Sequence, residues 1–147
     1  MRRPPSVSVV RWVVFVTIAL SLYHFTDNAI NVDDYPKAGW QPDWFDWVVV
    51  AAWFIYTAVG IYGYRLYAQG RYQAAHIGLI VYGYMIFSSL GHFLYGSPSE
   101  LTTHGVVSVF VDVTAGLAVI AVAVWSILAR RAGAPRCCFR FRVLGLP

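Results

Sequence analysis

Residues 88–112 read SSLGHFLYGSPSELTTHGVVSVFVD, and they contain the most informative polar pattern of the chain. One long apolar segment ends here at His92, and the next begins here, with His104, Ser108 and Asp112 at four-residue intervals. Ionisable side chains are costly in such segments, because an apolar environment solvates charge poorly. The stretch therefore predicts two helices of a membrane-embedded bundle, joined by a short link and polar near the linked end.

The chain as a whole is strongly apolar. Of its 147 residues, 59% are hydrophobic and 12% are charged, a balance too apolar for an ordinary soluble domain. Four continuous apolar runs each approach the ~20 residues that a helix needs to cross ~30 Å of hydrocarbon. They predict helices at about residues 9–27, 44–66, 74–95 and 98–129. Because the runs do not alternate, helices are favoured over a β-barrel.

We therefore expect one all-α domain over residues 1–131, a polytopic transmembrane four-helix bundle with up-down connections. Residues 132–147 form a basic tail that we expect to be poorly ordered. Two arginines before the first apolar run resemble the start of a signal peptide, but the run continues through Phe25, so a retained anchor is predicted.

The basic residues predict the orientation in the membrane. They flank the first, second and fourth segments, as Arg2, Arg3, Arg65, Arg71, Arg130, Arg131, Arg136, Arg140 and Arg142, whereas the other two links carry only Lys37. By the positive-inside rule both termini are cytoplasmic, and the links at residues 27–43 and 96–103 face outward. Since the charge flanks the membrane, we expect the lipid bilayer as partner and no nucleic acid.

Cys137 and Cys138 lie in the predicted cytoplasmic tail. Thiols normally stay reduced in that compartment, so no disulfide is predicted. An adjacent pair also lacks the ligand spacing of a zinc site. Lipidation of the pair is an alternative in a eukaryotic host.

The predicted topology brings polar side chains of three helices to one leaflet. They are His24, Asp27 and Asn28 on the first helix, Ser88 and His92 on the third, and Glu100, His104, Ser108 and Asp112 on the fourth. His76 is expected at the opposite end, at the interface and remote from the other three histidines. An ionised Asp112 costs about 2.5–3.5 kcal/mol at helix-centre depth unless it is paired. We expect His92 or His24 to be its partner.

Imidazoles together with carboxylates are ligands that zinc and non-haem iron use. The leading hypothesis is an outward-facing pocket that binds such a metal ion or a small amphipathic ligand. The candidate metal ligands are His24, His92, His104 and Asp112, and the candidate lining residues are Asn28, Ser88, Ser108 and Glu100. In a second hypothesis the protein is a metal-dependent hydrolase or lipid isomerase, in which the metal activates water and Asp112 or Asp27 transfers protons.

The pattern leaves further alternatives open, because the chain contains neither an HExxH motif nor a cysteine motif for metal binding. Two histidines on facing helices are a possible pair of haem ligands. A structural or assembly subunit is also compatible with the sequence, since polar side chains join helices in membranes without any chemistry.

Three runs carry a resemblance to known proteins. They are LYHFTDNAINVDDYP at residues 22–36, PDWF at 42–45 and SLGHFLYG at 89–96. Together they resemble a family of small four-helix bacterial membrane proteins to which no activity is assigned. The resemblance extends to about Arg131, and it implies a multi-pass protein of the bacterial inner membrane.

A looser resemblance, in layout alone, is to the EXPERA membrane domain, which includes sterol isomerases and lipid-binding receptors. It rests on His24 and Asp27 at the end of the first helix and on the Pro- and Trp-containing link before the second. Asp112 is the one candidate match to the deep acidic residues of that domain. The His, Asp and Ser set is also similar to that of alkaline ceramidase-like intramembrane hydrolases, which have more helices.

Overall fold

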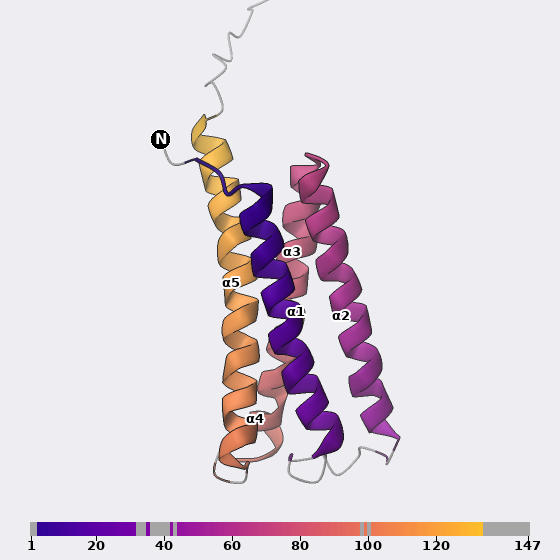
Figure 1. Cartoon of the computed structure of the whole chain (residues 1–147). Coiled ribbons are helices and arrows are strands. Elements are labelled where there is room, and N and C mark those ends of the chain that lie inside the picture. Colours follow the sequence, from indigo (N-terminus) through magenta and orange to yellow (C-terminus); the bar gives the residue numbers. More distant parts are fainter. Residues whose placement is uncertain are drawn as a thin grey trace, which may run out of the picture.

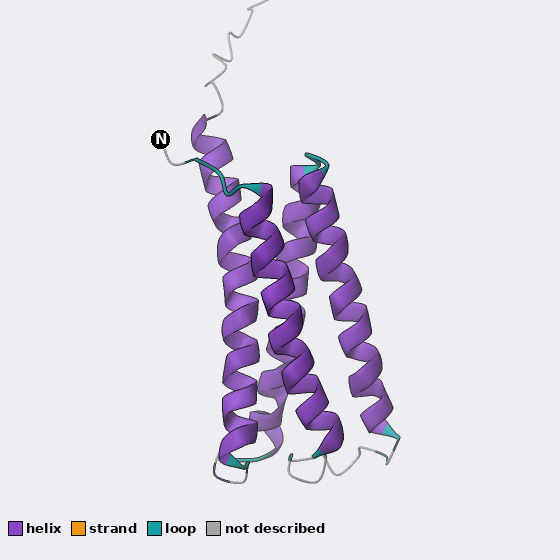
Figure 2. Ribbon diagram, in the orientation of Figure 1, coloured by secondary structure: helices purple, strands orange, loops and turns teal. Residues whose placement is uncertain are grey.

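The computed structural model describes residues 3–31, 35, 42, 44–97, 99 and 101–133. They form the helices α1 (Val7–Ile30), α2 (Phe45–Ala68), α3 (Tyr72–Ile86), α4 (His92–Tyr95) and α5 (Thr103–Gly133), with the 3₁₀ segment η2 (Phe87–Gly91) between α3 and α4. Figure 1 shows the long helices side by side, with the short α4 at the lower end. Figure 2 shows that helices account for almost all of the described chain.

Four helical spans are long and apolar enough to cross a membrane. They are Val7–Ile30, Trp47–Ala68, Tyr72–Leu94 and Thr103–Ala132. Large apolar side chains such as Trp12, Phe54 and Leu128 are exposed on the outside of the bundle, which suits a protein whose surroundings are lipid. The predicted all-α fold, with four helices able to span a membrane, is confirmed.

The start of the last long helix differs from the prediction. We expected a helix from residue 98, whereas α5 begins at Thr103. The Thr102 hydroxyl oxygen accepts a hydrogen bond of 3.1 Å from the Gly105 backbone N–H. Thr102 therefore caps the start of α5, and the helix does not need Ser97 as its N-cap. The described residues do not include Glu100 or residues 134–147, which contain both cysteines.

The third span also differs from the continuous helix expected at residues 74–95. It changes from α-helix to the 3₁₀ segment η2 at Phe87 and resumes as α4 at His92. A 3₁₀ helix has 3.0 residues per turn instead of 3.6, so it rotates the following side chains relative to a regular α-helix. Ser89 thereby faces the interior, while Ser88 is exposed beside Tyr56 of α2.

Each long helix packs against two others: α1 contacts α2 and α5, and α3 contacts α2 and α5. Glycines allow the closest approach between α3 and α5. A Cβ atom on Gly83 would lie 2.7 Å from the carbonyl oxygen of Gly116, and one on Gly116 would lie 2.8 Å from that of Gly83. Small residues at such crossings let two backbones approach within a membrane, where packing provides much of the attraction between helices.

An apolar core lies between two polar regions. Val10, Val14, Leu79 and Val119 belong to this core and are fully buried. At one end, the Tyr67 hydroxyl donates a 2.8 Å hydrogen bond to the Pro5 carbonyl oxygen. This contact places the end of α2 beside the start of α1, at the upper end of Figure 1, where α5 also ends. We call this the basic end, because Arg3, Arg65, Arg71, Arg130 and Arg131 lie near these helix termini.

His76 lies at the basic end, away from the other three histidines as expected, and it has partners there that were not predicted. It is buried, and its Nε2 lies 2.9 Å from the Ser126 hydroxyl oxygen of α5. That hydroxyl is also 3.1 Å from the hydroxyl of Tyr67. The sequence hides this network, because Tyr67, His76 and Ser126 belong to three different helices and only their packing shows that they meet.

Candidate functional site

Polar side chains of α1, α4 and α5 meet at the end opposite the basic end. We call this group the histidine cluster, and its members are His24, Asp27, Asn28, Tyr35, His92, His104 and Ser108. Five of them are at most 7% exposed, namely His24, Asp27, Asn28, Tyr35 and Ser108. The structure thus brings together the three predicted histidines and Asp27. Their side chains contact one another directly.

The carboxylate of Asp27 is the centre of the cluster. The Tyr35 hydroxyl donates to its Oδ2, and Asn31 Nδ2 donates to its Oδ1 over 2.7 Å. His104 Nε2 lies 3.1 Å from the same Oδ1. Three donors around one carboxylate form strong, charge-assisted hydrogen bonds when that carboxylate is ionised.

Tyr35 was not anticipated as a site residue. It follows α1 in the link and packs between Leu101 and Val109, with its ring centroid 4.6 Å from that of His92. Burial, together with the hydrogen bond to Asp27, raises the pKa of Tyr35 above its usual value. Its hydroxyl therefore stays protonated at neutral pH and remains a donor. The one sequence signal for it was an aromatic residue eight positions after Asp27.

Ser108 connects Tyr35 with His24. Its hydroxyl oxygen lies 3.0 Å from that of Tyr35 and 3.1 Å from His24 Nδ1. Because the single Tyr35 proton goes to Asp27, the Tyr35 oxygen can accept from Ser108, and Ser108 can then accept from His24 in the tautomer that carries its proton on Nδ1. The Gly105 carbonyl, at 2.9 Å, is a second acceptor for the Ser108 proton. In this arrangement the donors form a chain from His24 through Ser108 and Tyr35 to Asp27.

His104 connects the cluster with its surroundings. Its side chain is 55% exposed, whereas that of Asp27 is 5% exposed. The Tyr23 hydroxyl lies 2.8 Å from His104 Nδ1 and packs edge-on against the imidazole. Tyr23 was likewise not predicted as a site residue, because its position on α1 beside His104 depends on how α1 and α5 are rotated.

His92 completes the buried side of the cluster. Its Nε2 lies 2.8 Å from Asn28 Nδ2, so the amide donates and Nε2 is unprotonated in the neutral ring. The His92 and His24 ring centroids are 5.8 Å apart, in an edge-to-face arrangement. The two imidazoles are therefore neighbours, and each has its own hydrogen-bond partner.

Asp112 lies apart from these imidazoles, so the prediction of a His92 or His24 partner is wrong. The Ser89 hydroxyl instead donates to Asp112 Oδ2 over 2.5 Å. The physical reason is the 3₁₀ segment, which turns Ser89 towards α5 and carries His92 one turn further along. Asp112 is completely buried.

The predicted metal ligands are divided among three places. His24 and His92 are neighbours, His104 pairs with Asp27, and Asp112 lies with Ser89. Within the part of the chain that the structure describes, no three His, Cys, Asp or Glu side chains form a group that could hold a metal ion. Zinc or iron binding thus has no support in this geometry. Glu100, a predicted lining residue, is outside the described part.

The Ser, His and Asp members do not form a catalytic triad. Ser108 and His24 are at the distance expected of a nucleophile and its base. The Asp27 carboxylate, however, lies 3.5 Å from Ser108 itself and is bound to Tyr35, so it does not orient the imidazole from behind. Ser108 is also fully buried, and a substrate reaches it only if the cluster opens.

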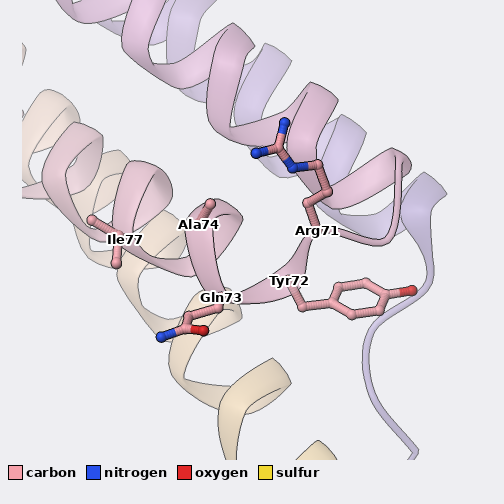
Figure 3. Close-up of a pocket in the computed structure, with 5 residues that line it drawn as sticks. All are labelled: Arg71, Tyr72, Gln73, Ala74 and Ile77. Atoms are coloured by element: carbon pink, nitrogen blue, oxygen red, sulfur yellow. The ribbon is translucent and has the colours of Figure 1, made fainter.

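A shallow, open hollow occurs at the basic end. Figure 3 shows its lining side chains at the turn between α2 and α3, namely Arg71, Tyr72, Gln73, Ala74 and Ile77. This hollow is distant from the histidine cluster, because it lies at the opposite end of α3 from His92. It therefore does not correspond to the predicted pocket.

Comparison with known protein families, with curated proteins and with solved structures found no match to this chain, so the resemblances noted from its sequence stay predictions.

Proposed function

We propose that this protein crosses the bacterial inner membrane four times, with up-down connections and both termini in the cytoplasm. The histidine cluster then lies at the outer face. The distribution of charge supports this orientation. All seven acidic residues fall between positions 27 and 112, whereas all the basic residues except Lys37 lie near the termini or near the link between α2 and α3.

The two native cysteines provide a test of this orientation. Cys137 and Cys138 belong to the proposed cytoplasmic tail. A membrane-impermeant maleimide should therefore label the protein only after cells are permeabilised. A variant with both cysteines changed to serine and one cysteine at position 37, in the proposed outer link, is the matched control and should be labelled in intact cells. Labelling of the native pair in intact cells contradicts the proposal.

We further propose that the histidine cluster exchanges protons between the membrane surface and the buried imidazole of His24. The observation that carries this proposal is the continuous series of contacts from exposed His104 through Asp27, Tyr35 and Ser108 to His24. Buried chains of acidic and His side chains in transmembrane segments often act as proton relays.

The chemistry of each member suits proton transfer. A carboxylate, a hydroxyl and an imidazole can each accept a proton on one atom and release one from the same group. Imidazole does so near neutral pH. Since this series of hydrogen-bonded side chains ends at the partly exposed His104, a proton can enter or leave it without opening the bundle. The function supported best is therefore that of a membrane protein with a proton-exchanging site.

Changing Tyr35 to phenylalanine should slow exchange of the His24 ring proton by about tenfold or more. The substitution removes the hydroxyl that joins Ser108 to Asp27, and tenfold corresponds to about 1.4 kcal/mol in barrier height. Solvent exchange at His24 is measured by NMR on protein labelled with ¹⁵N-histidine. Tyr56→Phe is the control, because the Tyr56 hydroxyl contacts Ser88 away from the cluster. Equal exchange rates in the two variants would contradict the relay.

The other predicted functions remain separate hypotheses for the same cluster. A bound zinc or iron ion is tested by elemental analysis of the sample used for the exchange experiment. Metal present at one equivalent, and lost in a His24→Ala, His92→Ala double variant, would replace the relay by a metal site. Binding of a small amphipathic ligand, like hydrolase or isomerase activity, requires the buried cluster to open.

A further inference from the structure

A second buried polar site lies about one helical turn from Ser108 towards the middle of the bundle. We call it the Asp112 site, and its members are Ser21 of α1, Tyr82 of α3, Ser89 of η2 and Asp112 of α5. All four side chains are at most 3% exposed. Neither the proposed proton relay nor the contacts of the histidine cluster use these residues.

The polar atoms of this site are incompletely partnered. Asp112 Oδ1, Ser21 Oγ and Tyr82 Oη have no hydrogen bond of good geometry among the described residues, although the Ser21 hydroxyl faces the Asp112 carboxylate as a weak donor and Tyr82 lies near it. Buried polar groups are nearly always hydrogen-bonded. A carboxylate oxygen and two nearby hydroxyls without well-formed hydrogen bonds therefore indicate a site that receives a further polar group.

The site has three hydroxyl protons, those of Ser21, Tyr82 and Ser89, but more oxygen lone pairs, because each hydroxyl oxygen has two and the Asp112 carboxylate has about four. The single proton of Ser89 has two acceptors within reach, Asp112 Oδ2 at 2.5 Å and the Ile86 carbonyl at 2.9 Å. The nearby Thr17 hydroxyl donates to the Ala115 carbonyl over 3.2 Å, so its proton is already in use. A group that accepts electron density from oxygen, such as a cation, matches this surplus of oxygen lone pairs.

The charge and the ligand type narrow the choice of cation. Among the described side chains, no Lys, Arg or His contacts Asp112, and its contacts are hydroxyl groups. Carboxylate and hydroxyl oxygens are hard ligands, which suit alkali and alkaline-earth ions better than softer metals. One carboxylate neutralises one positive charge, and a divalent ion would leave a net charge buried in an apolar environment.

The break in the third membrane span lies beside the same site. The segment η2 packs against α5 and interrupts the α-helix at Phe87. Interrupted transmembrane helices, whose backbone carbonyls and side-chain oxygens meet at mid-membrane depth, are a recurring architecture of sodium sites. We propose that the Asp112 site binds one monovalent cation of the sodium type, with Asp112 Oδ1 and Ser21 Oγ as ligands.

The stability of the detergent-purified full chain tests this proposal. Its thermal unfolding midpoint is measured in chloride salts of sodium, potassium and N-methylglucamine at equal ionic strength. Because a ligand that binds only the folded state stabilises it, the midpoint should rise with sodium by about 5 °C or more relative to N-methylglucamine. A wild-type midpoint that is the same in all three salts would overturn the proposal and would leave a water molecule as the occupant.

Matched serine variants localise the effect. Ser21→Ala and Asp112→Asn should abolish the sodium-dependent shift, whereas Ser88→Ala should keep it, because Ser88 is exposed beside Tyr56. A full shift in Ser21→Ala would overturn the proposal even if Asp112→Asn does not fold. The test is independent of proton exchange at His24, so either proposal can fail without the other.

Discussion

Gly83→Ala is expected to destabilise the protein by about 3 kcal/mol. Its new Cβ would lie 2.7 Å from both the Gly116 carbonyl oxygen and a side-chain carbon of Ile120. Ile120 can adjust its rotamer, but the carbonyl oxygen belongs to the backbone of α5 and moves only if the two helices separate. Overpacking of this kind typically costs about 1–3 kcal/mol, and more where a backbone must move.

Gly91→Ala is the matched control for this substitution. Gly91 lies in the same membrane span, and a Cβ atom on it would meet nothing within 4 Å. The same chemical change there should alter the free energy of unfolding by about 0.5 kcal/mol or less. Both variants are compared by reversible unfolding in mixed detergent micelles. Equal effects would mean that the approach of α3 and α5 at Gly83 does not limit stability.

Asp27→Asn is expected to cost a further, independent 3 kcal/mol or so. The carboxylate accepts hydrogen bonds from Tyr35 and Asn31 and also pairs with His104. An asparagine of the same shape offers one acceptor oxygen and turns an NH₂ group towards one set of donors. A buried donor without an acceptor costs about 1–3 kcal/mol, and hydrogen bonds to a charged group are the stronger ones.

A double-variant cycle separates this cost from a general disturbance of α1. Tyr35→Phe removes the buried donor, so the double variant should be more stable than the sum of the two single effects predicts. His104→Ala should cost about 1 kcal/mol or less, because the 55% exposed imidazole forms a solvent-screened pair. Strict additivity of Asp27→Asn and Tyr35→Phe would show that their hydrogen bond does not stabilise the cluster.

Part of the site was predictable from helix ends alone. His24, Asp27 and His92 were expected at one level, because each lies near the end of an apolar run and the runs have the length of a membrane span. The structure brings them into one cluster. Their hydrogen-bond partners were not predictable, since Ser108 lies 84 positions from His24 and Asn28 lies 64 positions from His92 along the chain.

The wrong predictions share a physical cause. Ser88 was expected inside and Asp112 beside an imidazole, on the assumption that residues 74–95 form a regular α-helix. The change to a 3₁₀ segment at Phe87 turns Ser89 inward instead. The position of His76 at the basic end was predictable, whereas its partner Ser126 was not, because that residue is 50 positions away on α5.

The amino-acid sequence by itself determined the number, the length and the apolar character of the helices that are able to span a membrane. These are local properties, set by the hydrophobicity of about 20 consecutive residues. Only the tertiary structure decided which hydroxyl meets which carboxylate and which imidazole. Those pairings depend on the rotation of each helix, on the glycine contacts that set the spacing of α3 and α5, and on the 3₁₀ segment. Each of these features must place the side-chain atoms to within about the length of one hydrogen bond.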